Sequence, residues 1–430
     1  MKMLLLIIIL ASISLSLVSV LKTTHMIQIL PSLYWTTLMS IPLYFTWDYF
    51  DLRVLKYQFI GVIIIHFFFL ISDLVTIRLL ERAKNINFNS PETFKNRVRA
   101  MLFIAIVIFP IAQYFQSSSF PIFSRLGRES FNKLDSPYAL ILLSMLTLSV
   151  LIPFIFIESI YKKRYLLVIV LLVWVGLYIF ATGAKGNIVH FIGGVLISYA
   201  LLRGKYWNKL IFILFFMFSV SIVFLGLLSI RSSENVPSNC KVPPIALSTP
   251  ANILRLGCAS TTQLNSNNFL NISLGYRVFL TPIEVSYYWY DLTLSDSNET
   301  RTISNLFDRN NENKFSNKIG IKYFVEPFPD NYATTINANA SIDADSFSFY
   351  KFYSVIFVAF IYSFIRVFIG VMSVHSRPSI RILSGIGLSK LILLPFSAGL
   401  QAILVPHGLA LIVVLILILK SNYAKSIIFK

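Results

Sequence analysis

The amino-acid sequence predicts an all-α polytopic integral membrane protein, with about eleven membrane-spanning helices and one large loop. Composition, the lengths of the apolar stretches and the charges between them predict this fold class. Of the 430 residues, 56% are hydrophobic and 13% are charged, whereas soluble domains carry roughly 25% charged residues. So few charges could not cover a water-facing surface. The composition therefore excludes soluble, disordered, collagen-like and coiled-coil proteins.

The apolar stretches have the length that a membrane helix needs, which is about 20 residues. They lie at 3–21, 28–46, 57–74, 100–116, 138–157, 165–182, 187–203, 209–229, 351–371, 380–395 and 402–419. The stretch 57–74 is interrupted by His66 and ends near Asp73, and the short stretch 380–395 contains Lys390. The chain therefore divides into eight predicted helices in 1–229, a loop at 230–350, and three predicted helices with a tail in 351–430.

Basic residues predict the orientation of the chain. The net charge of +18 (37 Lys and Arg less 19 Asp and Glu) is concentrated between alternate spans. The clusters lie at 78–99, 162–164, 203–209, 377–381 and 420–430. Because basic loops stay in the cytoplasm, we expect the C-terminus inside and the N-terminus outside. This rule, rather than nucleic-acid binding, explains the charge.

The first apolar segment has an alternative interpretation as a signal peptide with Lys2 in its basic region. Residues 21–24 offer no cleavage site with small residues, and the charge alternation holds if the segment is kept. We therefore expect a retained span.

The loop 230–350 is the one segment large enough to build an exposed site, and it carries nine Lys and Arg against eleven Asp and Glu. A second outside loop, about 117–137, contains Arg125 and Arg128. The two halves of the chain show no matching pair of broken helices, which argues against a secondary transporter.

Both cysteines, Cys240 and Cys258, fall in the long loop and bracket 17 residues. In an oxidising compartment they would form a disulfide, worth about 3 kcal/mol in the chain-entropy model. Two unpaired thiols are the alternative. We expect the disulfide, because two randomly placed cysteines would rarely share this loop.

The loops contain no P-loop, GxSxG, HExxH or CxxC motif. Asp343 and Asp345 form a DxD pair, and paired carboxylates can hold a divalent metal against a diphosphate. We instead expect a solvated stretch before the span at 351, with neither a metal nor a cofactor.

The segment 275–291 is rich in aromatic residues and contains three charges at intervals of seven, Arg277, Glu284 and Asp291. In a helix these charges share one face, with a kink expected at Pro282. Aromatic rings suit both a membrane interface and stacking on sugars. An interfacial helix whose charges only keep it wet is the alternative to a binding segment.

Two lysines occupy unusual positions. Lys185 lies between two glycines in the turn 181–187, where it would face lipid headgroups or a ligand phosphate. Lys390 lies inside an apolar run, which makes it a functional candidate by default. Pro395 follows five residues later, so Lys390 could instead reach outward to the interface.

Four segments resemble blocks of the O-antigen polymerase family, the Wzy-type polymerases of lipid-linked oligosaccharide repeat units. They are the turn 182–186, the Arg277-containing segment 276–282, the patch from Asn337 to Asn339, and the block from Lys390 to Pro395. Their order and sidedness agree with the family over nearly the whole chain.

The resemblance implies a GT-C-like glycosyltransferase in the bacterial inner membrane that acts at its periplasmic face. It would join undecaprenyl-diphosphate-linked repeat units into O-antigen or a related surface polysaccharide. It also implies membrane lipid and a chain-length regulator protein as partners, and no nucleic acid. Arg309, eleven residues before Gly320, fits the family's Arg-x10-Gly pattern, and Arg125 and Arg128 stand where its first-loop arginines would be.

The chemistry implied by the resemblance needs fixed cations, because the leaving group is a diphosphate and no metal site is evident. Arginine suits this role, being always charged and bidentate to phosphate. Glu284 or Asp291 could accept the proton of the acceptor hydroxyl. The remaining residues expected to bind substrate are Arg125, Arg128, Lys185, Arg309, Asn337, Asn339 and Lys390.

Two alternative functions remain. An O-antigen ligase would share the architecture and the donor, but ligases use a histidine in the long loop, and this loop has none. A lipid-oligosaccharide flippase, which is not an enzyme, would show repeat symmetry and would not need so large a loop.

Overall fold

The computed structural model describes residues 1–22, 26–47, 50–83, 146–182, 185–233, 281–295, 301, 316, 318–320, 322, 340–395, 398–405 and 407–428. Within these ranges the protein is mostly helical and has no strand. The all-α class predicted from the sequence is therefore confirmed for this part of the chain.

Three of the described helices are long and apolar enough to cross a membrane, at Leu52–Arg82, Tyr206–Leu225 and Phe352–Met372. They belong to α4 (Leu52–Ala83), α11 (Lys205–Ser233) and α17 (Phe352–Met372). Shorter apolar stretches occur in α1 (Lys2–Lys22), α8 (Ile152–Tyr161), α9 (Tyr165–Thr182), α10 (Lys185–Arg203) and α20 (Leu409–Ile428). These helices support a membrane protein, while the total of eleven spans stays a prediction.

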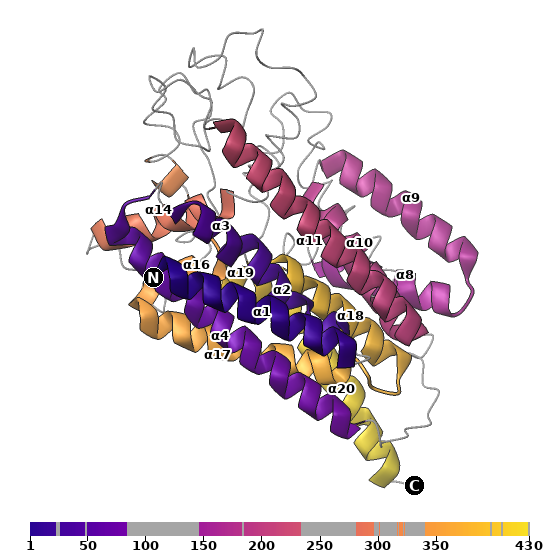
Figure 1. Cartoon of the computed structure of the whole chain (residues 1–430). Helices are drawn as coiled ribbons and strands as arrows, with labels where there is room; N and C mark the ends of the chain where they lie inside the picture. The colour runs from indigo at the N-terminus through magenta and orange to yellow at the C-terminus, as the bar shows by residue number, and fades with distance from the viewer. Residues whose placement is uncertain are drawn as a thin grey trace.

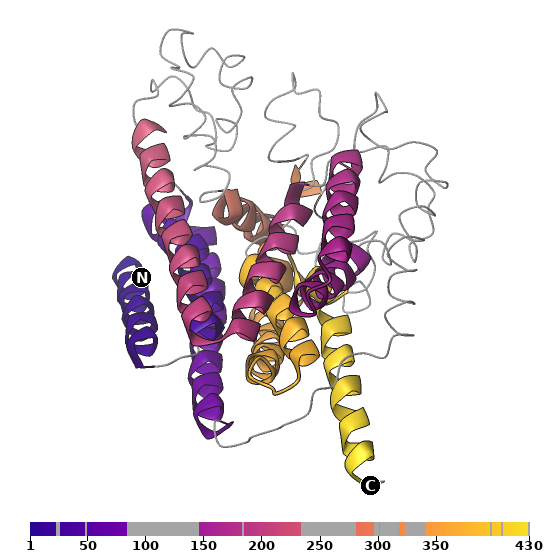
Figure 2. The same ribbon diagram turned by 90° about the vertical axis from the view of Figure 1, so that its right-hand side faces the viewer.

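Helices α4, α17, α18 (Pro378–Leu393) and α10 form the centre of the bundle (Figures 1 and 2). α17 packs on α4, where Phe69 stacks on Tyr362 with ring centroids 5.2 Å apart. α10 approaches α18 closely because small residues face each other: a Cβ added at Gly385 would lie 2.5 Å from the Cα of Ser198. Close approach of two backbones requires such residues.

The predicted span 28–46 is not one regular helix. It consists of η1 (Met26–Ile29), α2 (Leu30–Trp35), the π-helical turn η2 (Thr36–Ser40) and α3 (Ile41–Phe45). Pro31 and Pro42 lie in the first turns of α2 and α3, where the missing N–H costs little. Thr36 and Thr37 donate side-chain hydrogen bonds to carbonyls four residues back, which bends helices.

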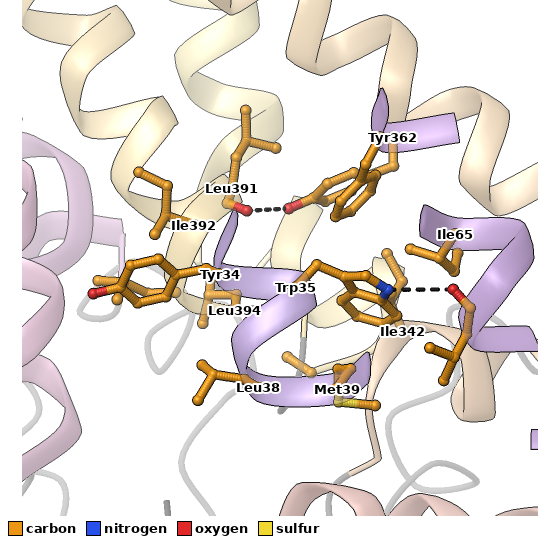
Figure 3. Close-up of a cluster of buried hydrophobic side chains, with 14 of the residues drawn as sticks. Tyr34, Trp35, Leu38, Met39, Ile65, Ile342, Tyr362, Leu391, Ile392 and Leu394 are labelled. Atoms are coloured by element: carbon orange, nitrogen blue, oxygen red, sulfur yellow. Dashed lines mark hydrogen bonds between the residues drawn. The ribbon is translucent and has the colours of Figure 1, made fainter. Parts of the chain in front are cut away.

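The core lies where α2, α4, α17 and α18 meet (Figure 3). The Trp35 indole N–H donates to the carbonyl of Val62 over 3.3 Å, and the Tyr362 hydroxyl donates to the carbonyl of Leu391 over 2.8 Å. These bonds satisfy the polar atoms of two large buried rings, as burial requires.

Two short helices, α14 (Thr281–Ser295) and α16 (Ile342–Tyr350), lie at one end of the bundle, and the C-terminus lies at the other (Figures 1 and 2). We call these the α14 end and the C-terminal end. α4 and α17 begin at the α14 end, whereas α18 ends there. The short helix α19 (Leu400–Leu404) also packs on α16.

The structure corrects one expectation about a helix limit. α4 does not end near Asp73 but continues to Ala83, because a partner on α17 neutralises Asp73. Pro282 is the second described residue of α14, and residues 275–280 lie outside the described part of the chain, so the kink stays a prediction.

Candidate functional site

The helix α14 is held against the start of α4 by specific contacts. The Gln58 amide donates to the carbonyl of Ile283 over 2.9 Å. The backbone N–H of Asp51 donates to the Tyr287 hydroxyl over 3.3 Å, and the Tyr287 ring stacks on Phe50 at 4.4 Å. The aromatic residues of α14 therefore pack largely against protein.

Glu284 is the most unusual group in this layer. Its side chain is buried, with 2% of the residue exposed, and its Oε2 atom has no hydrogen-bond partner among the described residues. Burial raises the pKa of this carboxyl well above its usual range. The interpretation of α14 as a helix whose charges only keep it wet does not fit this residue. Asp291, seven residues later on α14, is partly buried.

The DxD pair is also buried rather than solvated, which corrects the expectation for 343–345. Asp343 is 0% exposed and Asp345 is 4% exposed. Asp343 accepts hydrogen bonds from the Tyr290 hydroxyl at 3.1 Å and from the Ser341 hydroxyl. Burial raises the pKa of Asp343 to about 6, against the opposing effect of these donors. Burial, and to a smaller extent the charge of Asp343, raise the pKa of Tyr290 well above its usual range.

Asp345 forms an ion pair with Arg301, whose guanidinium lies 2.6 Å from the carboxylate. The same guanidinium lies over the ring of Phe349 at 4.2 Å, a cation–π contact. Both acidic residues of the pair thus have partners within the protein. Among the described residues, no group of three or more His, Cys, Asp or Glu side chains could hold a metal ion.

Two glycines let α4 and the residues after α18 approach this acidic layer. A Cβ at Gly61 would overlap the Tyr290 hydroxyl, and a Cβ at Gly399 would overlap the carboxylate of Asp345. The layer is therefore a tightly packed junction, and among its described carboxyls only Glu284 has a buried oxygen without a hydrogen-bond partner.

Lys390 lies in α18 with 1% of the residue exposed. It does not reach the protein surface, contrary to the alternative in which it extends toward the interface. No ion pair or hydrogen bond joins its ammonium group to another described residue. An unpaired buried charge is costly, so Lys390 remains a candidate for binding a ligand.

The structure contains a buried ion pair between α4 and α17 that was not predicted from the sequence. Arg366 of α17 pairs with Asp73 of α4, donates to the carbonyl of Phe69 over 3.1 Å, and lies near Gln28. Ser32 donates a further hydrogen bond to Asp73. An arginine inside an apolar run was the available signal, but nothing local identifies its partner.

The remaining predicted site residues fall outside the described part of the chain. They are Arg125, Arg128, Cys240, Cys258, Arg277, Arg309, Asn337 and Asn339. Lys185 is the first residue of α10. Glu284 and Asp291 lie on α14, which packs on α16, the helix that carries Asp343 and Asp345. Arg301, Tyr290, His190 and His407 are residues of interest that the sequence analysis did not select.

Glu284 can exchange a proton at the α14 end, and Lys390 offers a buried positive charge near the end of α18. This arrangement could support proton transfer and the binding of an anion. Comparisons of the chain with protein-family models, with curated proteins and with solved structures found no match.

Proposed function

We propose that this protein is a membrane glycosyltransferase that polymerises undecaprenyl-diphosphate-linked oligosaccharide repeat units. The growing glycan would be transferred from one lipid diphosphate to the non-reducing end of an incoming lipid-linked repeat. The proposal places the α14 end at the periplasmic face of a bacterial inner membrane. It rests on the family resemblance of the four sequence blocks and on the chemistry of Glu284.

The buried position of the Glu284 carboxyl is the main structural support for the proposal. Glu284 lies in α14, two residues after the family-like segment 276–282 that contains Arg277, and one oxygen of this buried carboxyl has no hydrogen-bond partner among the described residues. A raised pKa makes a carboxylate a stronger base once it is ionised. Glu284 is therefore suited to accept the proton of an acceptor hydroxyl.

The reaction would proceed as follows. The acceptor hydroxyl oxygen attacks the anomeric carbon of the donor sugar, and its proton passes to the Glu284 carboxylate. The bond between the anomeric carbon and the diphosphate oxygen breaks, and the diphosphate leaves with the electron pair. Arg277 would stabilise the charge that develops on this leaving group. Asp291 is the alternative base on the same helix.

Deleting the gene and separating the surface polysaccharide on a gel tests the function directly. The proposal requires a single repeat unit on the lipid acceptor. Long chains that remain unattached would instead indicate a ligase, and the loss of all repeats at the cell surface would indicate a flippase. Either of these results would overturn the proposal.

Variants expressed at equal membrane levels test the residues. Glu284→Gln and Arg277→Ala should leave mainly single repeats. Loss of one charge-stabilising contact costs about 2.7–4 kcal/mol, roughly 100- to 1000-fold in rate. Arg277→Lys should restore long chains only in part, because lysine lacks the planar guanidinium group that binds two phosphate oxygens at once. The matched control is Glu81→Gln, an exposed carboxylate near the C-terminal end of α4, which should give normal chains. Normal chains from Glu284→Gln would exclude this base.

A further inference from the structure

Three basic side chains from three separate elements come together near the α14 end of the bundle. They are Lys390 of α18, His190 of α10, and His407 in the turn before α20. The His190 and His407 rings lie 5.4 Å apart at an angle of 53°. Gly193, one turn after His190, packs against Ser389 and Leu393, which lie on either side of Lys390 in α18. These groups are separated by up to 217 positions in the sequence, so only the fold assembles them.

The cluster has hydrogen-bond donors but lacks an anionic partner in the described residues. Lys390 is 1% exposed, and neither an ion pair nor a hydrogen bond joins it to another described side chain. His190 Nδ1 is also buried without a hydrogen-bond partner in the described chain. A buried ammonium group can only donate, and burying its charge without a partner is unfavourable. Among the described residues, no negative charge therefore compensates this cluster.

The backbone around the cluster is fixed by close packing. Gly193, one turn after His190, lies against α18, so that an added Cβ would meet Leu393 at 3.0 Å. Gly408 has a φ of +77°, and a Cβ there would meet Val150 at 2.6 Å. Ser149 donates to the carbonyl of His407 over 3.3 Å. His190 and His407 are thus carried by closely packed backbone.

The π-helical turn η4 (Thr147–Leu151) supports the turn that carries His407. Such turns are rare and occur frequently at functional sites. Two long helices, α10 and α20, also begin at this end, and the positive ends of their dipoles favour an anion. These features add to the positive potential of the Lys390 side chain.

We propose that Lys390, His190 and His407 form a binding site for a phosphate or diphosphate group. Such a ligand supplies the negative charge and the acceptor oxygens that the cluster lacks, and lysine binds phosphate as a point charge. Lys390 lies one turn before the end of α18, and His190 lies in the second turn of α10. The assignment of the ligand as the undecaprenyl diphosphate of the substrate rests on the proposed function, whereas the site itself does not.

Binding to the purified full-length protein in nanodiscs of phosphatidylcholine tests the proposal. The probes are inorganic pyrophosphate for a free anion and geranylgeranyl diphosphate for a lipid headgroup, with geranylgeraniol as the uncharged control. We expect at least one diphosphate to bind and geranylgeraniol not to compete. Binding of pyrophosphate as tight as that of the lipid would identify a free anion as the ligand. Tighter binding of the lipid would identify a headgroup.

Lys390→Met should weaken diphosphate binding roughly 10- to 150-fold, the effect of losing one charged hydrogen bond, and Lys390→Arg should retain most of it. His407→Gln should weaken binding less and serves as the second variant if Lys390→Met does not fold. The matched control is Lys420→Met, an exposed lysine of α20 toward the C-terminal end. Absence of binding to the wild-type protein, or an equal loss from Lys420→Met, would overturn the site.

The outcomes also separate this site from the proposed function. If polymerisation is normal but no diphosphate binds at this cluster, the proposed binding site is wrong and the proposed polymerase function still holds. If diphosphate binding depends on Lys390 but deletion of the gene does not leave single repeats, the binding site holds and the polymerase function is wrong.

Discussion

At the scale of single residues, the α14 end depends on close contacts that tolerate no added atom. Gly61 of α4 admits the buried Tyr290 hydroxyl, which donates to Asp343 over 3.1 Å. Glycine is needed here for close approach rather than for an unusual backbone conformation. One methyl group would therefore displace a ring and break a buried hydrogen bond.

We predict that Gly61→Ala destabilises the protein by about 1–3 kcal/mol, the usual cost of overpacking a close-packed site. The measurement is thermal unfolding of the detergent-purified protein. Gly176→Ala in α9 is the control, because no atom lies within 4 Å of its added Cβ. Alanine is the better helix former, so this control should be neutral or stabilising. Equal melting temperatures for Gly61→Ala and wild type would contradict the packing at Tyr290.

The raised pKa of Asp343 predicts that the free energy of unfolding depends on pH. Its pKa is raised to about 6 in the folded protein, against about 3.9 in an unfolded chain. The folded state therefore binds this proton more tightly than the unfolded chain does. The contribution of protonated Asp343 to the free energy of unfolding is lost as the pH rises from about 4 through 6. Glu284 acts in the same direction over its own range, since burial raises its pKa too.

We expect wild-type protein to melt at a higher temperature at pH 5 than at pH 7.5. Asp343→Asn should reduce this difference, because the amide does not titrate. Tyr290→Phe should move the Asp343 transition to higher pH, since the lost hydrogen bond favours the charged carboxylate. An unchanged pH dependence in Asp343→Asn, measured by the same unfolding assay, would assign the effect to other groups.

At the scale of whole elements, the ion pair between Asp73 and Arg366 joins α4 to α17 inside the apolar part of the bundle. The Gln28 amide of η1 donates to the Ser373 hydroxyl over 2.7 Å, which connects the same region to the end of α17. Removing one partner of a buried pair leaves the other charge without compensation. The pair therefore specifies how these helices are placed against each other.

We predict that Arg366→Met alone destabilises the protein by about 3–5 kcal/mol, and that Asp73→Asn combined with Arg366→Met recovers much of the loss. A double-mutant cycle on the melting free energies gives the coupling. The control pair is Glu158→Gln with Lys162→Met, a partly exposed ion pair on α8 and in the turn after it, where we expect a coupling below about 1 kcal/mol. Additive effects at Asp73 and Arg366 would show that the pair does not couple the helices.

At the scale of the whole molecule, the arrangement of helix ends is compatible with a chain that crosses a membrane repeatedly. α4, α10, α17 and α20 begin at the α14 end, and α18 runs in the opposite direction between α17 and α20 (Figures 1 and 2). The basic clusters of the sequence predict that the C-terminal end is cytoplasmic.

We predict eleven spans, with the N-terminus outside and the C-terminus inside. A phosphatase fused near Asn268 should be active, and one fused near Lys84 should be silent. A cytoplasmic reporter at the same two positions should give the opposite activities and controls for expression. The reverse pattern in both reporters would overturn the orientation, and with it the assignment of the long loop to the periplasm.

The helical class and the apolar segments could be read from the sequence because they depend on local properties. A run of about 20 apolar residues has few structures available in a bilayer, since its backbone must satisfy its own hydrogen bonds. The predicted stretch 57–74 accordingly lies within α4, and the stretches 165–182, 187–203 and 351–371 coincide closely with α9, α10 and α17. The total number of spans and their orientation remain predictions.

The partners of the buried polar groups required the tertiary structure. Asp73 and Arg366 are 293 positions apart, and the spacing of Asp343 and Asp345 gave no sign that Tyr290 and Arg301 would bury them. Likewise, Lys390 was recognisable as an intramembrane charge, but its neighbours His190 and His407 were not. The physical reason is that the environment of a charge is set by whichever elements pack on it, whereas the tendency to form an apolar helix lies within the segment itself.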